Sequence, residues 1–594
     1  MSSFNKYFWI FGGCILFGFG LCAHAQLIAT TWNPGRNPVQ PSDEQWTTAG
    51  NWSAQLVPIA GYKAYFNAGA APCIVHSAVG GCQISIGDGG PGGALIVTNG
   101  GSLNASDTAA GNTTPITATP ASVASNSVPA WLSIQLSGTN LALSWPTSAL
   151  YYGLQWATNL AAPVVWQSLT NIPITANGTN EVILPLAGQT TFYSLNHGVD
   201  ATTMYHKLLM GYQGWFACPN DGSAPDQWWH WFHSQAATAT NANMDFLPDE
   251  TGFGPNELFA TAMTYSNGTP VRLYSSAVPE TVLRHFQWMQ ENQLDGVFLQ
   301  RFLTDLSNPE FFAFRNQVTA NVRAAAEATG RVFAIMYDVS GQPTNTLLSN
   351  LTNDWLYLVH SLPVTNSTRY LWHQGRPVVA IWGFGFNDGN HLATPQQAQA
   401  VINWFKSQNV TVVGGVPTYW RTLSNDAYTN AAWTPVYLSF DVLSPWSVGR
   451  YGNNSGADSY TASITVPDLA KCKSNGIDYL PVVFPGFSWH NENGGTLNQI
   501  PRNGGAFYWR QIYDDVRAGC NMIYGAMFDE VNEGTAMYKL VPTAAQLPAQ
   551  GKFLALNCDG IPLNSDWYLR LANEAGQMLR GEIPLQSDLP ISPP

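Results

Sequence analysis

Short apolar runs, each followed by a helical pattern, dominate the chain from about Thr203 onward. A run without alternation is typical of a strand buried on both faces of a parallel sheet. The runs cover residues 208–212, 296–299, 332–336, 378–382, 410–413, 436–440, 479–484 and 522–528. These eight strands predict a C-terminal (β/α)8 TIM barrel. An open doubly wound sheet is the alternative, but no Gly-rich phosphate loop follows the first run.

Helical periodicity lies between most of these runs. Phe311, Phe314, Val318 and Val322 follow steps of three and four, and Gly330 predicts the end of that helix. Pro279 suits the first position of another helix. Further helices are expected at residues 395–406, 467–473 and 507–518. The barrel domain is therefore assigned to residues 199–594.

The chain before the barrel reads as two small all-β modules. Residues 26–104 hold short apolar stretches broken by Gly, Pro and Asn, which fit a small sandwich or a few solenoid coils equally well. Residues 105–127, rich in Thr, Ala, Ser and Pro, are typical of a linker. In residues 128–198 apolar and polar positions alternate again, as in short strands. This pattern predicts a fibronectin-III or immunoglobulin-like sandwich, with Trp145 or Trp156 as the core tryptophan.

Residues 1–25 have the pattern of a secretory signal peptide. Lys6 supplies the positive charge, residues 7–21 are apolar, and Ala23 and Ala25 form a small-x-small cleavage site. A lipoprotein signal at Cys22 is less consistent, because Leu21 occupies a position where a small residue is favoured. No later segment is long and apolar enough to span a membrane. We expect cleavage after Ala25 and a secreted or periplasmic protein without a membrane anchor.

The composition of the chain argues against some classes of binding partner. The formal net charge is −13, which argues against nucleic acid or an anionic membrane. Only 10% of residues are charged, whereas 13% are aromatic and 23 are Trp, enough to fill a core and line a binding surface. The six cysteines beyond the signal match no zinc spacing, and Cys73 and Cys82 are candidates for a disulfide within a hairpin. No cofactor or metal is predicted.

The last apolar run ends in acidic residues. Residues 522–528 are followed by Asp529, Glu530, Asn532, Glu533 and Gly534. The carboxyl ends of the strands are where a β/α barrel carries its chemistry. Two carboxylates three positions apart in one turn point to glycoside hydrolysis, which uses a pair of acids.

Aromatic and polar residues follow the other strands as well. Aromatic rings stack on the C–H faces of sugars while polar groups bind hydroxyls, so this mixture indicates a carbohydrate site. The candidate substrate-binding residues are Tyr212, Trp215, Trp229, His230, Gln300, Arg301, Tyr337, Asp338, Trp382, Trp420, Trp446, Trp489, His490, Asp529 and Asn532.

Several segments of the barrel domain resemble bacterial proteins grouped with glycoside hydrolase families 71 and 99, some of which carry names such as xylosidase or arabinosidase. The similar segments are residues 212–216, 230–232, 284–289, 295–301, 376–382 and 528–535. Family 99 contains retaining endo-α-mannosidases with a (β/α)8 fold, and its last-strand motif reads Asn-Glu-Trp-His-Glu-Gly-Thr. Here Glu530, Glu533, Gly534 and Thr535 match it, whereas Asp529, Val531 and Asn532 depart from it.

The resemblance implies that Glu533 is the general acid/base. Glu530 would act as a base on the sugar 2-hydroxyl, forming a 1,2-anhydro intermediate, or as a direct nucleophile on a substrate of other geometry. The departures leave the sugar open. We therefore expect a secreted, retaining glycoside hydrolase acting on a poly- or oligosaccharide.

Two other functions are consistent with the sequence. A non-catalytic carbohydrate-binding protein on a degenerate barrel would explain the altered inner motif, although a binder needs no pair of acids. A metalloenzyme would need His230, His490, Asp441 and Asp529 to converge.

Overall fold

The computed structural model describes residues 191–594 without a gap, and only separate segments before them. These segments are residues 28–31, 62–66, 73–75, 79–80, 83–86, 95–97, 103–104, 132–137, 140–147, 152–158, 167–169 and 173–185. The chain divides into two compact units, Met1–Gly198 and Val199–Pro594. The signal peptide, the predicted linker and a disulfide between Cys73 and Cys82 lie outside what is described.

The described part of the N-terminal unit consists of strands. They are β1 (Ile28–Thr31), β2 (Tyr62–Phe66), β3 (Cys73–Val75), β4 (Val79–Gly80), β5 (Gln83–Ile86), β6 (Leu95–Val97), β7 (Leu103–Asn104), β8 (Ser133–Ser137), β9 (Asn140–Pro146), β10 (Tyr152–Ala157), β11 (Gln167–Ser168), β12 (Ile174–Ala176), β13 (Thr179–Pro185) and β14 (Thr191–His197). The order β12-β13-β9-β8 forms an antiparallel sheet, and β11-β10-β14-β6-β3 forms a mixed sheet in which β3 and β6 are parallel. Trp145, with 2% of its surface exposed, packs with Leu143, Leu154 and Val182 in the core of this unit.

A parallel sheet forms the centre of the C-terminal unit. Its strands are β15 (Leu208–Tyr212), β18 (Gly296–Phe302), β19 (Val332–Asp338), β21 (Arg376–Trp382), β22 (Thr411–Val416), β23 (Val442–Pro445), β24 (Asp478–Tyr479), β25 (Val482–Val483) and β26 (Ile523–Gly525). Their order is β24-β23-β22-β21-β19-β18-β15-β26-β25. The path begins on β24 and ends on β25, which only Leu480 and Pro481 separate in the chain. The two ends of the sheet therefore meet on one segment, as in a TIM-like barrel.

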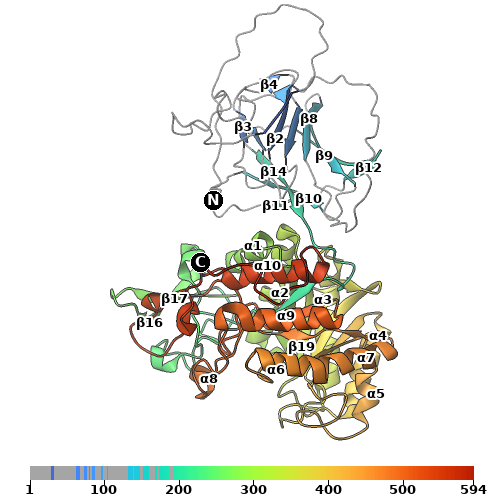
Figure 1. Ribbon diagram of the computed structural model, residues 1–594, viewed down its shortest axis with the longest axis vertical. Coiled ribbons are helices and arrows are strands. Elements are labelled where there is room, and N and C mark those ends of the chain that lie inside the picture. Colours follow the sequence, from blue (N-terminus) through green and yellow to red (C-terminus); the bar gives the residue numbers. More distant parts are fainter. Residues whose placement is uncertain are drawn as a thin grey trace, which may run out of the picture. The chain divides into compact units, whose positions relative to one another are not determined.

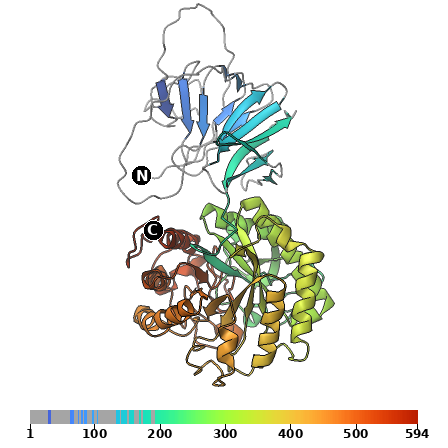
Figure 2. The ribbon, with the colours of Figure 1, turned by 90° about the vertical axis from the view of Figure 1, so that its right-hand side faces the viewer.

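Helices surround this sheet (Figures 1 and 2). They are α1 (Pro279–Glu291), α2 (Pro309–Thr329), α3 (Leu347–His360), α4 (Pro395–Ser407), α5 (Trp433–Tyr437), α6 (Asn454–Tyr460), α7 (Val466–Ser474), α8 (His490–Asn493), α9 (Ala506–Ala518) and α10 (Trp567–Arg580). A hairpin of β16 (Leu258–Thr264) and β17 (Pro270–Tyr274) precedes α1, and β20 (Trp372–His373) pairs with β21. Among the described residues, none of the helices combines the length and apolarity needed to cross a bilayer.

The helices predicted from periodicity are confirmed. Helix α2 begins after Asn308, whose side chain accepts hydrogen bonds from the amides of Glu310 and Phe311. It ends at Gly330, whose φ of 72° is the left-handed conformation that favours glycine. Helix α1 starts at Pro279, as expected.

The prediction of a strand at residues 436–440 is wrong. Val436 and Tyr437 belong to the short helix α5, and the sixth strand, β23, begins at Val442. Val436, Tyr437 and Phe440 are all buried. A short buried helix and a buried strand give the same apolar run, so periodicity alone does not separate them.

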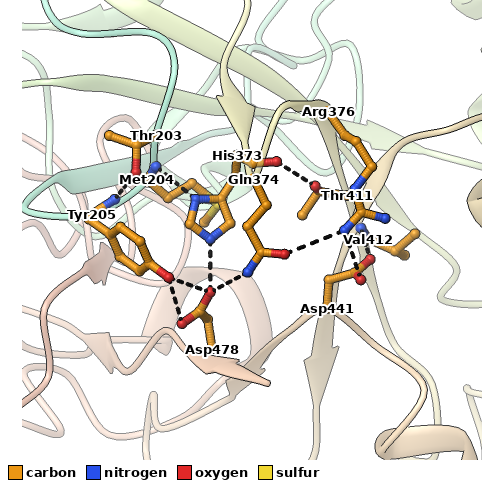
Figure 3. A network of polar contacts seen from close by, with 10 residues as sticks. All are labelled: Thr203, Met204, Tyr205, His373, Gln374, Arg376, Thr411, Val412, Asp441 and Asp478. Carbon is orange, nitrogen blue, oxygen red and sulfur yellow. Dashed lines mark hydrogen bonds and ion pairs between the residues drawn. The ribbon is translucent and has the colours of Figure 1, made fainter. Parts of the chain in front are cut away.

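A polar network fixes the amino-terminal ends of the strands (Figure 3). Asp478, which begins β24, accepts hydrogen bonds from the Tyr205 hydroxyl at 3.0 and 3.1 Å and from Gln374 at 2.9 Å, and contacts His373 Nε2 at 2.9 Å. The amide of Met204 donates to His373 Nδ1 at 3.2 Å. Because Nδ1 accepts, Nε2 carries the proton and donates to Asp478. This network joins the entry of the first strand to β20 and β24.

A buried ion pair connects β18 to its helices. Arg301, 0% exposed, donates Nη2 to Asp354 Oδ1 at 2.6 Å and Nε to Oδ2 at 2.9 Å. Its remaining guanidinium hydrogens bond Thr319 and Asn316 of α2. Removing one partner of such a pair leaves a buried charge without compensation.

We expect Asp354→Asn to lower the free energy of unfolding by about 3–5 kcal/mol, because Arg301 would keep its charge in an apolar layer. Chemical denaturation followed by tryptophan fluorescence measures this. The matched control is Glu327→Gln, which removes an ion pair to Arg323 with side chains 28% and 39% exposed, and should cost under about 0.5 kcal/mol. Equal losses in both variants would contradict this account of the buried pair.

Candidate active site

A tight turn at the end of the eighth strand positions the acidic residues. After β26 the chain turns through residues 531–534, and the carbonyl of Glu530 accepts hydrogen bonds from the amides of Thr535 at 3.0 Å and Ala536 at 2.7 Å. Gly534 has a φ of 65°, and a Cβ there would lie 2.9 Å from the amide nitrogen of Ser488. This position therefore requires glycine.

Asp529 ties this turn to the first strand. Its carboxylate accepts hydrogen bonds from the backbone amides of Gln213 at 2.7 Å and Gly214 at 2.9 Å. Burial raises the pKa of Asp529 to about 6, and the two amide bonds limit the rise. Asp529 is fully buried. It thus aligns the ends of β15 and β26, with both carboxylate oxygens hydrogen-bonded to the backbone.

Glu530 lies beneath the surface with one oxygen held. Gln213 Nε2 donates to Glu530 Oε2 at 2.5 Å, while Oε1 has no hydrogen-bond partner among the described residues. The residue is 2% exposed. Burial raises its pKa well above the usual value, and the charges of Glu533 and Asp529 raise it further, against the Gln213 bond. One oxygen is fixed and the other is available for chemistry.

Glu533 is partly exposed at the same turn. Burial and the negative charges of Glu492 and Asp338 raise its pKa to about 7. Glu530 and Glu533 are coupled carboxylates that do not both ionise easily, so they titrate as a pair. Negative charges act on both groups, and the bond from Gln213 favours the anion of Glu530. Glu533, with its pKa of about 7, is therefore a group that can hold a proton close to neutral pH.

Stacked aromatic rings lie beside the turn. The rings of Trp215 and His230 stack with centroids 3.8 Å apart and an interplanar angle of 7°. Trp229 packs against Phe311 at 4.2 Å. Burial and the charge of Arg315 lower the pKa of His230 well below its usual value, so this ring is neutral.

Asn532 links three parts of the site. Its side-chain amide donates to the carbonyl of His230 at 3.0 Å and to Glu492 Oε2 at 3.2 Å. Its own oxygen is buried without a partner among the described residues. His230 has a φ of 61°, a conformation that non-glycine residues seldom adopt. Asn532 thereby holds the His230 backbone in place.

Other candidates lie at the ends of β19, β21, β23 and β25. Asp338 Oδ1 accepts from the amide of Ser340 at 2.8 Å, and Asp338 acts electrostatically on Glu533. Trp382 and Trp446 are half-buried with ring centroids 5.4 Å apart. Trp489 and His490 are also half-buried, and His490 Nδ1 lies 2.7 Å from the carbonyl of Gly495.

Four further candidates have side chains that bond other residues of the protein. Arg301 and Tyr337 both bond Asp354 of α3, and Tyr337 does so at 2.7 Å. Trp420 is 2% exposed and donates Nε1 to Asp468 at 2.8 Å. The hydroxyl of buried Tyr212 lies 2.9 Å from His285 Nδ1. These side chains are buried or bonded within the barrel domain.

The side chain of Gln300 contacts a residue of another barrel strand. It precedes Arg301, and its amide donates to the hydroxyl of Tyr524 at 3.1 Å. Successive residues of a strand point to opposite faces. Gln300 therefore faces β26 while Arg301 faces the helices.

Two residues at the site were not predicted from the sequence. Gln213 lies directly after β15, and Glu492 lies in α8. For Gln213 a signal existed, since it belongs to the segment 212–216 that resembles the hydrolase families. Glu492, in a polar stretch rich in Asn and Gly, carried no comparable signal.

No metal site emerges from the described residues. They contain no group of three His, Cys, Asp or Glu side chains suited to a metal. Asp441, one of the four candidate ligands, lies 3.1 Å from Arg376 and 3.4 Å from Lys406. Cys218, Cys472, Cys520 and Cys558 are free thiols.

Comparisons with known proteins find similarity in solved structures. The GH99 endo-alpha-mannosidase from Bacteroides thetaiotaomicron is 15% identical, with 64% of this chain and 99% of that chain covered and a TM-score of 0.45. GH5_18 from Streptomyces cattleya in complex with GlcNAc is 12% identical over 52% of this chain and 76% of its own, with a TM-score of 0.32. A structure described as a glycoside hydrolase-like protein is 14% identical, covers 54% and 91%, and has a TM-score of 0.39. No family model and no curated protein matches the chain.

The raised pKa of Glu533 predicts how stability depends on pH. The folded-state pKa of about 7 lies above the ordinary value of 4.5, so the stability that the protonated group contributes is present below pH 4.5 and is lost as pH rises through about 7. Glu533→Gln cannot ionise. We therefore expect the melting temperature of this variant, relative to the native chain, to increase between pH 4.5 and pH 8.

Thermal unfolding at several pH values measures this difference. The control is Glu310→Gln, which removes a carboxylate from the exposed start of α2 and should shift the melting temperature by the same amount at every pH. A difference for Glu533→Gln that stays constant across the range would contradict the buried, proton-bearing pair.

Proposed function

We propose that residues 199–594 form a (β/α)8 glycoside hydrolase that cleaves a poly- or oligosaccharide with Glu530 and Glu533. The observation that carries the proposal is the pair itself: two carboxylates from one turn at the carboxyl end of β26, one anchored by Gln213 and the other with a pKa of about 7. A group that holds its proton near neutral pH suits general acid catalysis.

In the proposed reaction, Glu533 donates its proton to the oxygen of the leaving sugar as the glycosidic bond breaks. Glu530 uses its free oxygen, Oε1, in one of two ways. It removes the proton from the sugar 2-hydroxyl, whose oxygen then closes onto the anomeric carbon, or it attacks that carbon directly. Glu533, now a carboxylate, next deprotonates a water that attacks the anomeric carbon. In the first route the bond from that carbon to the 2-oxygen breaks and the 2-oxygen takes its proton back from Glu530; in the second the ester bond to Glu530 breaks. Configuration is retained in both routes.

The surrounding residues support a carbohydrate substrate. Trp229, Trp382, Trp446 and Trp489 are half-buried, so part of each indole remains open to a ligand. The neutral His230 and the unpartnered oxygen of Asn532 offer polar contacts beside the acids. These features fit a ligand with alternating C–H faces and hydroxyls.

The proposal extends to the whole chain through its sequence. Residues 1–25 would direct export, with cleavage after Ala25, and the protein would act in the periplasm or outside the cell. Residues 26–104 and 128–198 would be accessory modules joined by the linker 105–127. The resemblance of residues 528–535 to the family 99 motif supports placement among family 71/99-like hydrolases.

We expect Glu533→Gln and Glu530→Gln each to lower kcat/KM by about 10²–10⁴-fold, because each removes one half of the acid and base chemistry. The measurement is sugar release from α-mannans, arabinoxylans and α-1,3-glucans by the mature protein. In the native protein, kcat/KM should fall as pH rises through about 7, when Glu533 loses its proton.

Glu310→Gln, at the exposed start of α2, is the control and should retain native kcat/KM. Hydrolysis that survives in both active-site variants would show that other residues do the chemistry. A protein that binds one glycan equally well in all forms, yet cleaves none, would be a carbohydrate-binding protein on a barrel without activity.

A further inference from the structure

The segment that carries Glu492 is fixed against the body of the barrel. Asp245, fully buried, accepts hydrogen bonds from the amides of His490 at 2.8 Å and Asn491 at 2.8 Å, and from the Ser488 hydroxyl at 2.5 Å. The side chain of Asn491 donates to the carbonyl of Met244 at 2.8 Å. Glu492 therefore projects from a backbone with little freedom to move.

Two hydrogen bonds join this segment to the catalytic turn. The amide of Ser488 donates to the backbone carbonyl of Glu533 at 2.9 Å. On the other side of the turn, Asn532 Nδ2 donates to Glu492 Oε2 at 3.2 Å. Since Asn532 directly precedes Glu533, Glu492 is held beside the proposed acid/base by contacts at both ends of the segment.

The groups around Glu492 and Glu533 are mostly acidic. The negative charges of Glu492 and Asp338 raise the pKa of Glu533, and Glu492 has the larger effect of the two. Burial raises the pKa of Glu492 itself and Asp245 adds to the rise, whereas the bond from Asn532 and the charge of His233 lower it. His233 Nε2 lies 2.9 Å from the carbonyl of Asn491.

Three side-chain oxygens at the site have no hydrogen-bond partner in the part of the chain that the structure describes. Glu530 Oε1, Asn532 Oδ1 and Gln213 Oε1 are buried and have no hydrogen-bond partner among the described residues. Each belongs to a residue that is more than nine-tenths buried. A negative charge near such a site acts through a medium of low dielectric, where it has a larger effect than in water.

We propose that Glu492 is a positioning residue of this site, a third carboxylate whose charge keeps the proton on Glu533 between turnovers. The use of this role in catalysis rests on the proposed hydrolase function, whereas an effect of the Glu492 charge on Glu533 does not require that the protein cleave a sugar. Glu492 does not touch the reacting atoms. It acts through Glu533, and Asn532 holds it in place.

The test is the titration of Glu533 in Glu492→Gln, a substitution that removes the charge and still leaves an oxygen to accept from Asn532. The full mature chain, labelled with carboxyl-¹³C glutamate, is followed by NMR from pH 4 to 9, and the Glu533→Gln variant assigns the signal. We expect the midpoint of Glu533 to fall by about 0.5–1 pH unit. In the pH profile of kcat/KM, the decline on the alkaline side should shift to lower pH by the same amount.

Two variants serve as controls. Glu492→Asp keeps the charge and should keep a midpoint close to that of the native chain, and Glu310→Gln removes a distant exposed charge and should leave the midpoint unchanged. If Glu492→Gln does not fold, Asn532→Ser releases the Glu492 side chain and should lower the midpoint in the same direction.

An unchanged midpoint in folded Glu492→Gln would overturn the proposal. A lowered midpoint in a protein that cleaves no glycan would support the role of Glu492 while removing the hydrolase assignment. The NMR titration and the assay of hydrolysis therefore separate the two failures.

Discussion

The hydrogen bonds from the backbone amides of Gln213 and Gly214 to Asp529 are the contact on which the site depends. They join the end of the first strand, β15, to the end of the last, β26, with which it pairs. The backbone amide of Gln213 bonds to Asp529, and its side-chain amide donates to Glu530. One carboxylate thus fixes the backbone so that a neighbouring carboxylate can be placed.

Burial gives the two remaining acids their different properties. Both lie near other acids, but Gln213 supplies a hydrogen-bond donor to Glu530, whereas Glu533 is partly exposed to solvent. In water both groups would ionise near pH 4.5. Inside the protein, burial and the neighbouring negative charges raise both pKa values, so the pair resists holding two negative charges at once.

The sequence allows prediction of those features whose signals lie close together along the chain. The turn with Glu530 and Glu533 is marked in the sequence by acidic residues directly after an apolar run, and α2 is predictable because its start and stop signals are local. The bonds of Arg301 and Tyr337 to Asp354 could not be predicted, because an apolar run does not reveal which face of the strand points to the helices. Glu492 was missed because its role comes from a contact to Asn532, forty positions away in sequence.

The segment that leads into the barrel has a consequence for where the chain can be cut. The apolar pattern of the barrel begins near Thr203, but Val199 already donates to the carbonyl of Gly330 at 2.8 Å, and the carbonyl of Ala201 accepts from Trp372 at 2.6 Å. These residues run across the amino-terminal ends of the strands as a strap. A shortened chain that begins at residue 203 would lose the strap and expose the edge it covers. A protease acting between the two units would leave an intact barrel only by cutting before Val199.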